Sequence, residues 1–150
     1  MRYKLALFSF LLFAFAVSAQ NKGPVKWTYD VKKIGEKEYN LVFKAIIGKG
    51  VHMYSQHIKG DGPIPTSFSF NKTNGIKLID SVIEKSKAIK EHDEMFDMEL
   101  VYFFDVAQFE QHIKVTGEAK NVTGSLEYMA CDGTKCYPPE TVNFTFQLPQ

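Results

Sequence analysis

Cysteine is scarce in this chain, which has only two among its 150 residues. That number is too small for a miniprotein held together by several disulfides. Positive charge is not in excess either, because eighteen Lys and Arg residues face seventeen Asp and Glu residues. The composition therefore argues against a nucleic-acid partner, which would need a basic surface. With 45% hydrophobic residues, the chain is too apolar to be disordered, and its length suits one globular domain.

A long hydrophobic run is missing outside the N-terminus. The N-terminal run, Leu5–Val17, is shorter than the roughly 20 apolar residues that cross a bilayer. Arg2 and Lys4 precede it, and small residues follow it up to Ala19. This is the pattern of a secretory signal peptide. We therefore expect a signal peptide over residues 1–19 and an exported domain over residues 20–150, without stable membrane insertion.

A helical pattern is hard to find in the rest of the chain. Residues 84–95 are charged and could form a helical turn, but they lack an apolar stripe. Apolar residues instead recur at every second position, which is typical of half-buried strands, and turn-forming residues separate the runs. The pattern predicts eight or nine short strands in an all-β, immunoglobulin-like antiparallel β-sandwich. The runs cover residues 27–31, 39–45, 68–70, 76–80, 100–104, 113–115, 126–130 and 142–148.

The two cysteines lie in the most specific segment of the sequence, Tyr128–Glu140. Asp132-Gly133 directly after Cys131 indicates a turn, from which the chain returns through Cys136. Outside the cytoplasm, two thiols within reach of each other are normally oxidised. A bond that closes so short a loop stabilises a domain by only about 2 kcal/mol, whereas an accessible disulfide exchanges with incoming thiolates. Residue chemistry alone leaves a structural role and an exchange role open.

Three blocks of the sequence resemble one known family. They are Cys131–Glu140, which contains Cys-Tyr-Pro-Pro-Glu, the segment Gly50–Gln56, and the segment His92–Phe96. Together with the strand pattern, they resemble the N-terminal periplasmic domain of the thiol:disulfide interchange protein DsbD. The cysteine block is the specific one, and the other two count only beside it.

The resemblance implies a periplasmic, immunoglobulin-like module that relays reducing equivalents, as a component of a protein-disulfide reductase. Cys136 would form the mixed disulfide with a partner, and Cys131 would resolve it. The electron donor would be a thioredoxin-like protein. The acceptor would be a disulfide isomerase or a thiol protein of cytochrome c maturation. Apart from the redox-active disulfide, no cofactor or metal is implied, and we expect a monomer.

The resemblance also implies a cap over the disulfide. Phe96, or Met95 beside it, would cover the sulfurs until a partner displaces the loop. Asp93 and Glu94 match acids near the pair, whose negative charge would raise the pKa of a thiol. Tyr54 matches a tyrosine that packs beside the site.

The sequence departs from the family pattern in three ways. His52 stands where a tyrosine is usual, and the loop between the cysteines is one residue shorter. The family's membrane domain and C-terminal thioredoxin domain are not found in these 150 residues. We therefore expect the electron donor to be a separate, membrane-anchored chain.

Two other functions stay open. One is an exported β-sandwich that binds a protein or ligand and carries a purely structural disulfide. The other is a relay domain that has lost its partners. A zinc site built from His52, His57, His92 and a cysteine is disfavoured, because His52 and His57 would point to opposite faces of one strand. Reduction by a mild dithiol without unfolding would distinguish a relay disulfide from a structural one.

Overall fold

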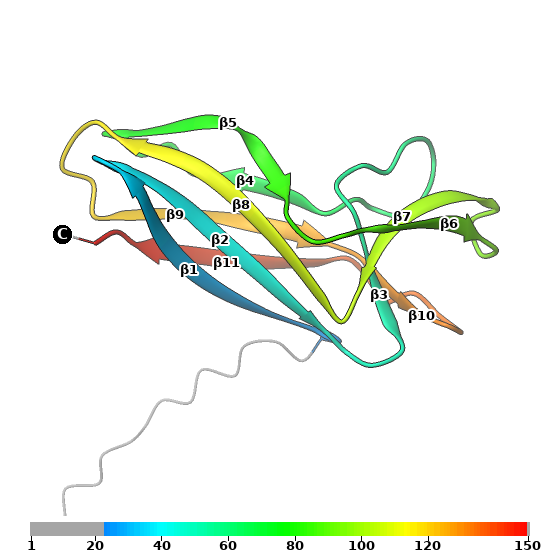
Figure 1. Cartoon of the computed structure of the whole chain (residues 1–150). Helices are drawn as coiled ribbons and strands as arrows, with labels where there is room; N and C mark the ends of the chain where they lie inside the picture. Colours follow the sequence, from blue (N-terminus) through cyan, green and yellow to red (C-terminus); the bar gives the residue numbers. More distant parts are fainter. Residues whose placement is uncertain (1–22, 150) are drawn as a thin grey trace, which may run out of the picture.

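The computed structural model describes residues 23–149, and the expected signal peptide lies outside this range (Figure 1). Within these residues the chain forms eleven strands, and no helix long and apolar enough to cross a membrane is found. Every strand pair is antiparallel. The strands are β1 (Val25–Gly35), β2 (Glu38–Ile47), β3 (Val51–Tyr54), β4 (Ser67–Phe70), β5 (Ile76–Glu84), β6 (Ile89–Asp93), β7 (Met98–Phe104), β8 (Val106–Val115), β9 (Asn121–Tyr128), β10 (Ala130–Asp132) and β11 (Glu140–Gln147).

The strands form three sheets, with the orders β1-β2-β8-β5, β10-β3-β7-β6 and β11-β9-β4. The first and third sheets face each other and make the body of a β-sandwich. The second sheet continues from this body at the end opposite the C-terminus (Figure 1). The all-β sandwich expected from the alternating pattern is thus confirmed.

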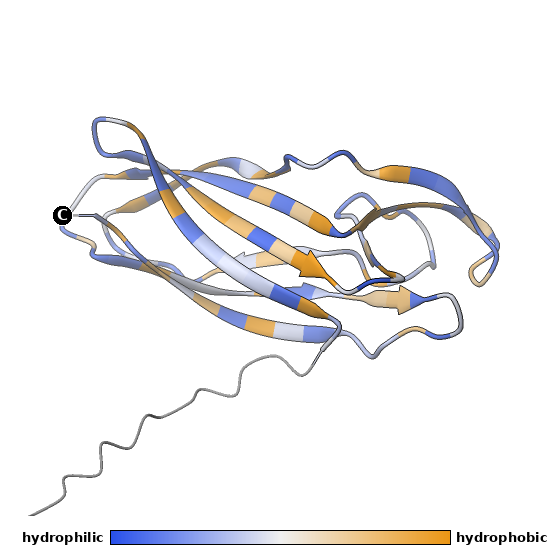
Figure 2. Cartoon of the chain, turned by 60° about the horizontal axis from the view of Figure 1, so that its bottom comes forward, coloured by the Kyte–Doolittle hydropathy of each residue, from blue (hydrophilic) through white to orange (hydrophobic). Residues whose placement is uncertain are grey.

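The core of the sandwich is aromatic. Apolar and polar residues alternate along its strands (Figure 2), so that one face of each strand is buried. Phe43 is fully buried, with ring centroids at 4.7 Å from Phe68 and 4.9 Å from both Phe144 and Phe146. Such ring pairs add about 0.5–1.5 kcal/mol each beyond the area they bury. The body therefore has a well-packed core that includes neither cysteine.

The second sheet is reached by chain segments that leave the sandwich body. A turn at Gly48–Gly50 leads from β2 to β3, and Met129 joins β9 to β10. The chain returns from β7 to β8 at Asp105, which has a φ of 57°. The Asp105 carbonyl accepts a hydrogen bond from the Ile47 amide at 2.8 Å, which ties the two sheets together at this corner. The second sheet thereby projects short strands from a rigid base.

Residues 84–95, whose charged sequence lacks an apolar stripe, form no helical turn. The segment ends β5, forms β6 and enters the turn that follows it, and β6 pairs with β7 in a register that places Glu91 opposite Leu100. β6 is the edge strand of its sheet and is almost entirely exposed. Charged side chains suit such an edge, because they hinder pairing with another chain. Hydrogen bonding to β7 therefore decides the conformation of a segment that has little pattern of its own.

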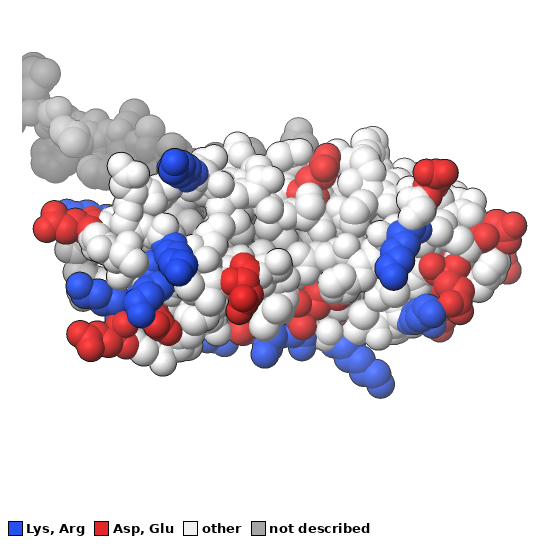
Figure 3. Space-filling model, turned by 90° about the horizontal axis from the view of Figure 1, so that it is seen from above, with Lys and Arg blue, Asp and Glu red and all other residues white. Residues whose placement is uncertain are grey.

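Charges of both signs are mixed on the surface. On the face seen in Figure 3, Lys side chains lie among Asp and Glu side chains along the length of the molecule. Interspersed charges of this kind keep a domain soluble without creating a field of one sign. This face accordingly offers no basic stripe for a phosphate backbone.

Candidate functional site

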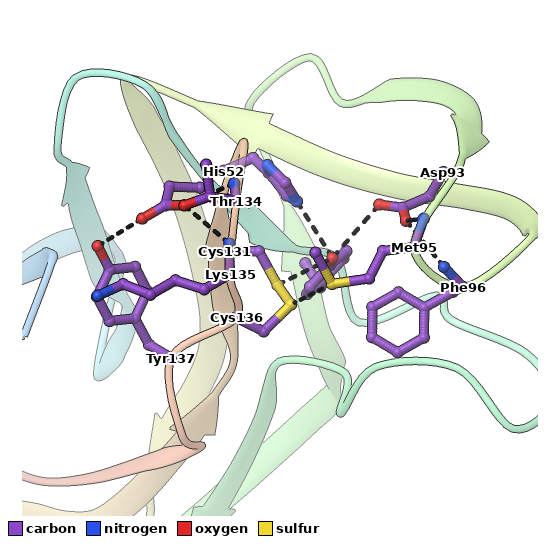
Figure 4. The surroundings of a disulfide bond; sticks show 11 residues. His52, Asp93, Met95, Phe96, Cys131, Thr134, Lys135, Cys136 and Tyr137 are labelled. Atoms are coloured by element: carbon purple, nitrogen blue, oxygen red, sulfur yellow. Dashed lines mark hydrogen bonds between the residues drawn. A yellow bond between two sulfur atoms is a disulfide. The ribbon is translucent and has the colours of Figure 1, made fainter.

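A tight hairpin presents the two cysteines at the end of the second sheet (Figure 4). The Asp132 amide donates to the Lys135 carbonyl at 2.8 Å, and the Tyr137 amide donates to the Ala130 carbonyl at 2.9 Å. The Asp132 carboxylate closes the turn by accepting from the Thr134 hydroxyl at 2.7 Å and from the Thr134 and Lys135 amides at 2.8 and 3.0 Å. It also accepts from the Tyr137 hydroxyl at 2.9 Å. These bonds, led by the one from the Thr134 hydroxyl, hold the pKa of Asp132 far below its ordinary value.

Cys131 and Cys136 form a disulfide across this hairpin. The two sulfurs differ in their access to solvent. Cys131 lies in β10 opposite His52 of β3 and is 1% exposed, whereas Cys136 lies on the returning arm and is only half-buried. A thiolate arriving from solvent therefore meets Cys136 before Cys131.

Tyr54 is placed beneath the disulfide by its backbone. Its amide donates to the Met129 carbonyl at 3.2 Å, and its carbonyl accepts from the Thr66 hydroxyl at 2.5 Å. The Tyr54 side chain is fully buried, in a small cluster that also contains Leu100 and Cys131. A rigid strand end thus fixes the position of the phenol ring.

The Tyr54 hydroxyl lies among three polar groups. It is 3.2 Å from Cys131 Sγ, 3.1 Å from His52 Nε2 and 3.5 Å from Asp93 Oδ2. A phenol has one proton to donate, and both the disulfide sulfur and the carboxylate can only accept. Of these two acceptors the sulfur is nearer, which favours a hydrogen bond from Tyr54 to Cys131 Sγ. His52 Nε2 lies on the other side of the hydroxyl, and whether it donates or accepts there depends on the tautomer of the ring.

Burial shifts the pKa of both ring side chains at the site. Burial, followed by the neighbouring Asp93 carboxylate, raises the pKa of Tyr54 well above its ordinary value of 10.0. Burial lowers the pKa of His52 below 6.5, although Asp93 and Asp132 partly oppose that effect. At neutral pH, Tyr54 is therefore protonated and His52 is mostly uncharged.

The loop between β6 and β7 covers the disulfide from the other side. Asp93 Oδ1 accepts from the Met95 and Phe96 amides at 2.9 and 3.1 Å, which fixes the turn. Met95 Sδ lies 3.3 Å from Cys136 Sγ, while the ring of Phe96 packs edge-on against Tyr54 with centroids 6.1 Å apart. Met95 is thus the residue in contact with the more accessible sulfur, and Phe96 supports the loop from below.

A hollow of about 430 Å³ opens beside Cys131. Glu94, which is exposed, lines it together with His52, Asp93 and Met95. The structure therefore brings together all eight residues that the sequence suggested for the site. They are His52, Tyr54, Asp93, Glu94, Met95, Phe96, Cys131 and Cys136.

Several residues at the site carry roles that sequence reasoning did not assign. Asp132 was recognised as part of a turn, but its bond to Tyr137 could not be read from the pattern. Tyr102 donates to Glu91 at 2.7 Å, and burial together with that bond raises the pKa of Tyr102 to about 12.

His57, considered above as a zinc ligand, lies beyond the end of β3 and is exposed. Among residues 23–149, no three His, Cys, Asp or Glu side chains are grouped so that they could hold a metal ion.

A β-sandwich that presents an unequally exposed disulfide beneath a loop has the features of a thiol:disulfide exchange domain. The chain belongs to the family described as thiol:disulfide interchange protein DsbD, N-terminal, whose model matches residues 19–148. This confirms the family inferred from the cysteine block and the two weaker segments. No curated protein matches the chain.

Solved structures show the same fold. The chain is similar to the reduced DsbD N-terminal domain of Neisseria meningitidis, with a TM-score of 0.54, 18% identity, and coverage of 83% of this chain and 86% of that one. The N-terminal periplasmic domain of ScsB from Proteus mirabilis gives a TM-score of 0.60 at 10% identity, with coverage of 87% of this chain and 47% of that one. The Neisseria DsbD N-terminal domain in complex with the PilB N-terminal domain gives 0.50 at 16% identity, with coverage of 79% and 80%.

Proposed function

We propose that this protein is a periplasmic thiol:disulfide relay module that passes reducing equivalents between thioredoxin-like proteins through Cys131 and Cys136. The observation that carries the proposal is the difference between the two sulfurs. Cys136 is half-buried beside Met95, whereas Cys131 is fully buried and accepts a hydrogen bond from Tyr54 at 3.2 Å. A structural disulfide needs neither feature.

Reduction of the domain proceeds by two exchange steps. A donor thiolate attacks Cys136 Sγ, the Cys131–Cys136 bond breaks, and Cys131 leaves as a thiolate. The second thiolate of the donor then attacks the donor's own sulfur in the mixed disulfide and releases Cys136. The donor has lost two electrons and now carries a disulfide, while the domain holds two reduced cysteines. Delivery to an acceptor reverses these steps, with Cys136 attacking and Cys131 resolving.

The surroundings of Cys131 suit a leaving group. The hydroxyl of Tyr54 already points its proton toward the sulfur, and a hydrogen bond to a charged acceptor contributes about 1.5–3 kcal/mol. Asp93 opposes this by placing a negative charge near the same hydroxyl. The balance between the Tyr54 hydrogen bond and the Asp93 charge determines how readily the Cys131 thiolate forms. It thereby influences the reduction potential of the pair.

Access to Cys136 requires Met95 to move. Its thioether contacts the sulfur at 3.3 Å, and 53% of its surface is exposed. An unbranched methionine has low barriers to changing its conformation. A partner with an apolar rim around its own cysteine can therefore displace Met95, whereas small thiols are kept away from the resting disulfide.

The family indicates the nature of the partners. We propose a thioredoxin-like electron donor on a separate, membrane-anchored chain, and an acceptor that is a disulfide isomerase or a thiol protein of cytochrome c maturation. The domain would act as an exported monomer without a cofactor, released from a signal peptide near Ala19. In this role it is one component of a protein-disulfide reductase.

Trapping of mixed disulfides tests the proposal. The probe is a thioredoxin whose second active-site cysteine is replaced by serine and whose first is activated with thionitrobenzoate. Cys131→Ser, which leaves Cys136 free, should form a covalent complex rapidly, and Cys136→Ser should do so far more slowly. Equal rates, or no reaction of either variant, would favour the alternative of a binding domain with a structural disulfide.

The reduction potential of the pair provides a second test. Exchange catalysts lie between about −120 and −270 mV, whereas structural disulfides lie below about −300 mV. Equilibration of the wild-type domain with dithiol buffers, followed by thiol alkylation, measures this value. A potential within the first range is expected.

A further inference from the structure

The resolving step needs an outlet for a proton. Cys131 can release a partner from Cys136 only as a thiolate, because thiolates are the attacking species in disulfide exchange. With 1% of its surface exposed, Cys131 has almost no contact with solvent that could take this proton. A protein group within hydrogen-bond distance of the sulfur is therefore the nearest acceptor.

The Tyr54 hydroxyl is in contact with Cys131 and connects it to a base. It lies 3.2 Å from Cys131 Sγ and 3.1 Å from His52 Nε2. A hydroxyl can accept a hydrogen bond and donate one at the same time, so it can pass a proton in either direction. Asp93 is the weaker alternative, because its Oδ2 is 3.5 Å away and its Oδ1 is occupied by the Met95 and Phe96 amides.

We infer that His52 is a positioning residue that takes the proton of Cys131 through the Tyr54 hydroxyl when the domain resolves a mixed disulfide, and returns it when the domain is reduced. The inference rests on the proposed function, since it concerns the second step of the same exchange. Histidine suits this task because its ring changes charge near neutral pH.

The step balances in atoms and charge. In the mixed disulfide Cys131 carries its own proton, so the Tyr54 hydroxyl turns its proton toward His52, whose neutral ring holds its proton on Nδ1 and leaves Nε2 free to accept. The Cys131 thiol passes its proton to the Tyr54 oxygen, and the Tyr54 proton passes to His52 Nε2. The Cys131 thiolate then attacks Cys136 Sγ, the Cys131–Cys136 bond forms, and the partner leaves as a thiolate. The imidazolium of His52 finally loses its proton to solvent or to the departing thiolate. Because Tyr54 receives one proton as it gives another, no tyrosinate accumulates.

The charged groups around His52 support this role. Asp132 on β10 and Asp93 at the end of β6 both favour the imidazolium. On β7, Tyr102 lies with its ring centroid 4.8 Å from that of His52, and its hydroxyl is already bonded to Glu91. The same hollow is lined by His92 and Glu94. Burial keeps His52 uncharged at rest, so that it is ready to accept, and the nearby acids stabilise the charge once the proton arrives.

Stopped-flow reaction of the reduced domain with excess dithionitrobenzoate separates the two steps. Cys136 attacks the reagent and releases a first equivalent of thionitrobenzoate, and Cys131 then resolves the mixed disulfide and releases a second. In the wild type, the second rate should rise with pH through a midpoint below 6.5 and then level off, following the pKa of His52. Thionitrobenzoate leaves without taking up a proton, so the pH dependence of the second rate reports only on the deprotonation of Cys131.

His52→Gln keeps a side chain that can bond to Tyr54 but cannot titrate. We expect its second rate to fall about 100-fold at pH 7, the lower end of what proton transfer by a positioned side chain contributes. The pH midpoint of the second rate in His52→Gln should move up to the pKa of the Cys131 thiol itself. Tyr54→Phe, which removes the path but keeps His52, should show the same loss. His57→Gln, an exposed histidine outside the site, serves as the matched control and should behave as the wild type.

The outcomes separate the two proposals. Absence of the first release in every variant would overturn the relay function itself. A normal first release in His52→Gln, followed by a second with the wild-type pH midpoint, would overturn the role of His52 whatever its rate. A normal first release of thionitrobenzoate by His52→Gln, followed by a second release whose pH midpoint is displaced from that of the wild type, supports the role of His52.

Discussion

At the scale of single residues, the turn between the cysteines depends on one carboxylate. Asp132 accepts hydrogen bonds from three groups within the turn and one from Tyr137 outside it. Hydrogen bonds donated to a carboxylate favour its ionised form, which is why the pKa of Asp132 is so low. The position of Cys136 relative to Cys131 therefore depends on a charge that persists in acid.

The low pKa of Asp132 predicts how the hairpin responds to acid. A carboxylate whose pKa is lowered by folding stabilises the folded form above its ordinary pKa of 3.8 and loses that effect only as the pH falls through the lowered value. The Thr134 and Lys135 amide resonances should therefore stay unchanged between pH 7 and 4 and move only below 3.8. In Asp132→Asn, this acid transition should be absent. A wild-type midpoint at the ordinary value would contradict the bonding of the turn.

Met95 illustrates how one side chain can control reactivity. Removing its thioether in Met95→Ala uncovers Cys136, so reduction of the disulfide by dithiothreitol should accelerate several-fold at unchanged stability. The rate is followed by quenching with acid and alkylating the free thiols. Ile83→Ala, which truncates a comparably exposed side chain on β5, is the control and should leave the rate unchanged. Equal rates for Met95→Ala and the wild type would mean that the loop does not limit access.

At the scale of elements, the close packing of β9 depends on a residue without a side chain. Gly124 lies at the centre of β9, opposite Phe70 of β4 and Phe144 of β11. A Cβ atom at this position would collide with the Ser69 carbonyl oxygen and approach Phe144 Cζ to 2.5 Å. The backbone carbonyl cannot move aside without breaking the ladder, so the strand tolerates only glycine here.

We expect Gly124→Ala to lower the free energy of unfolding by about 1–3 kcal/mol, the usual cost of forcing extra atoms into a packed interior. Urea denaturation followed by tryptophan fluorescence of Trp27, the single tryptophan, measures this change. Gly133→Ala is the matched control, because a Cβ there meets nothing within 4 Å. If both variants were equally stable, the packing of β9 against β4 would be looser than described.

At the scale of the whole molecule, the sandwich core and the redox site are separate bodies of packed side chains. The larger cluster joins the first and third sheets, reaches into the second sheet through residues such as Met53 and Phe103, and contains no cysteine. Cys131 belongs to a smaller cluster with Tyr54, Leu100 and Tyr102 in the second sheet. Changes in the disulfide therefore leave the larger cluster intact, as a relay that alternates between two redox states requires.

Reduction should accordingly leave the domain folded. Opening a ring of this size removes about 2 kcal/mol of stabilisation, which corresponds to a fall in Tm of about 5–10 °C. Thermal unfolding with and without a dithiol, followed by circular dichroism, tests this expectation. Cys131→Ala/Cys136→Ala should match the reduced wild type. Complete unfolding on reduction would identify the disulfide as a structural bond instead.

Local sequence pattern is enough to predict the sandwich body and the identity of the reactive pair. Strands such as β1 and β9 alternate over many residues, so their buried faces follow from period two alone. Two cysteines can pair within one chain in only one way.

The second sheet depends instead on tertiary contacts, because β3, β6 and β10 are too short for a periodic pattern and form through pairing with one another and with β7. Tertiary contacts also bring Met95 Sδ to 3.3 Å from Cys136 Sγ and join His52, Tyr54 and Cys131 in one chain of contacts. Those distances depend on where β3, β10 and the loop after β6 meet in space, which no local pattern encodes.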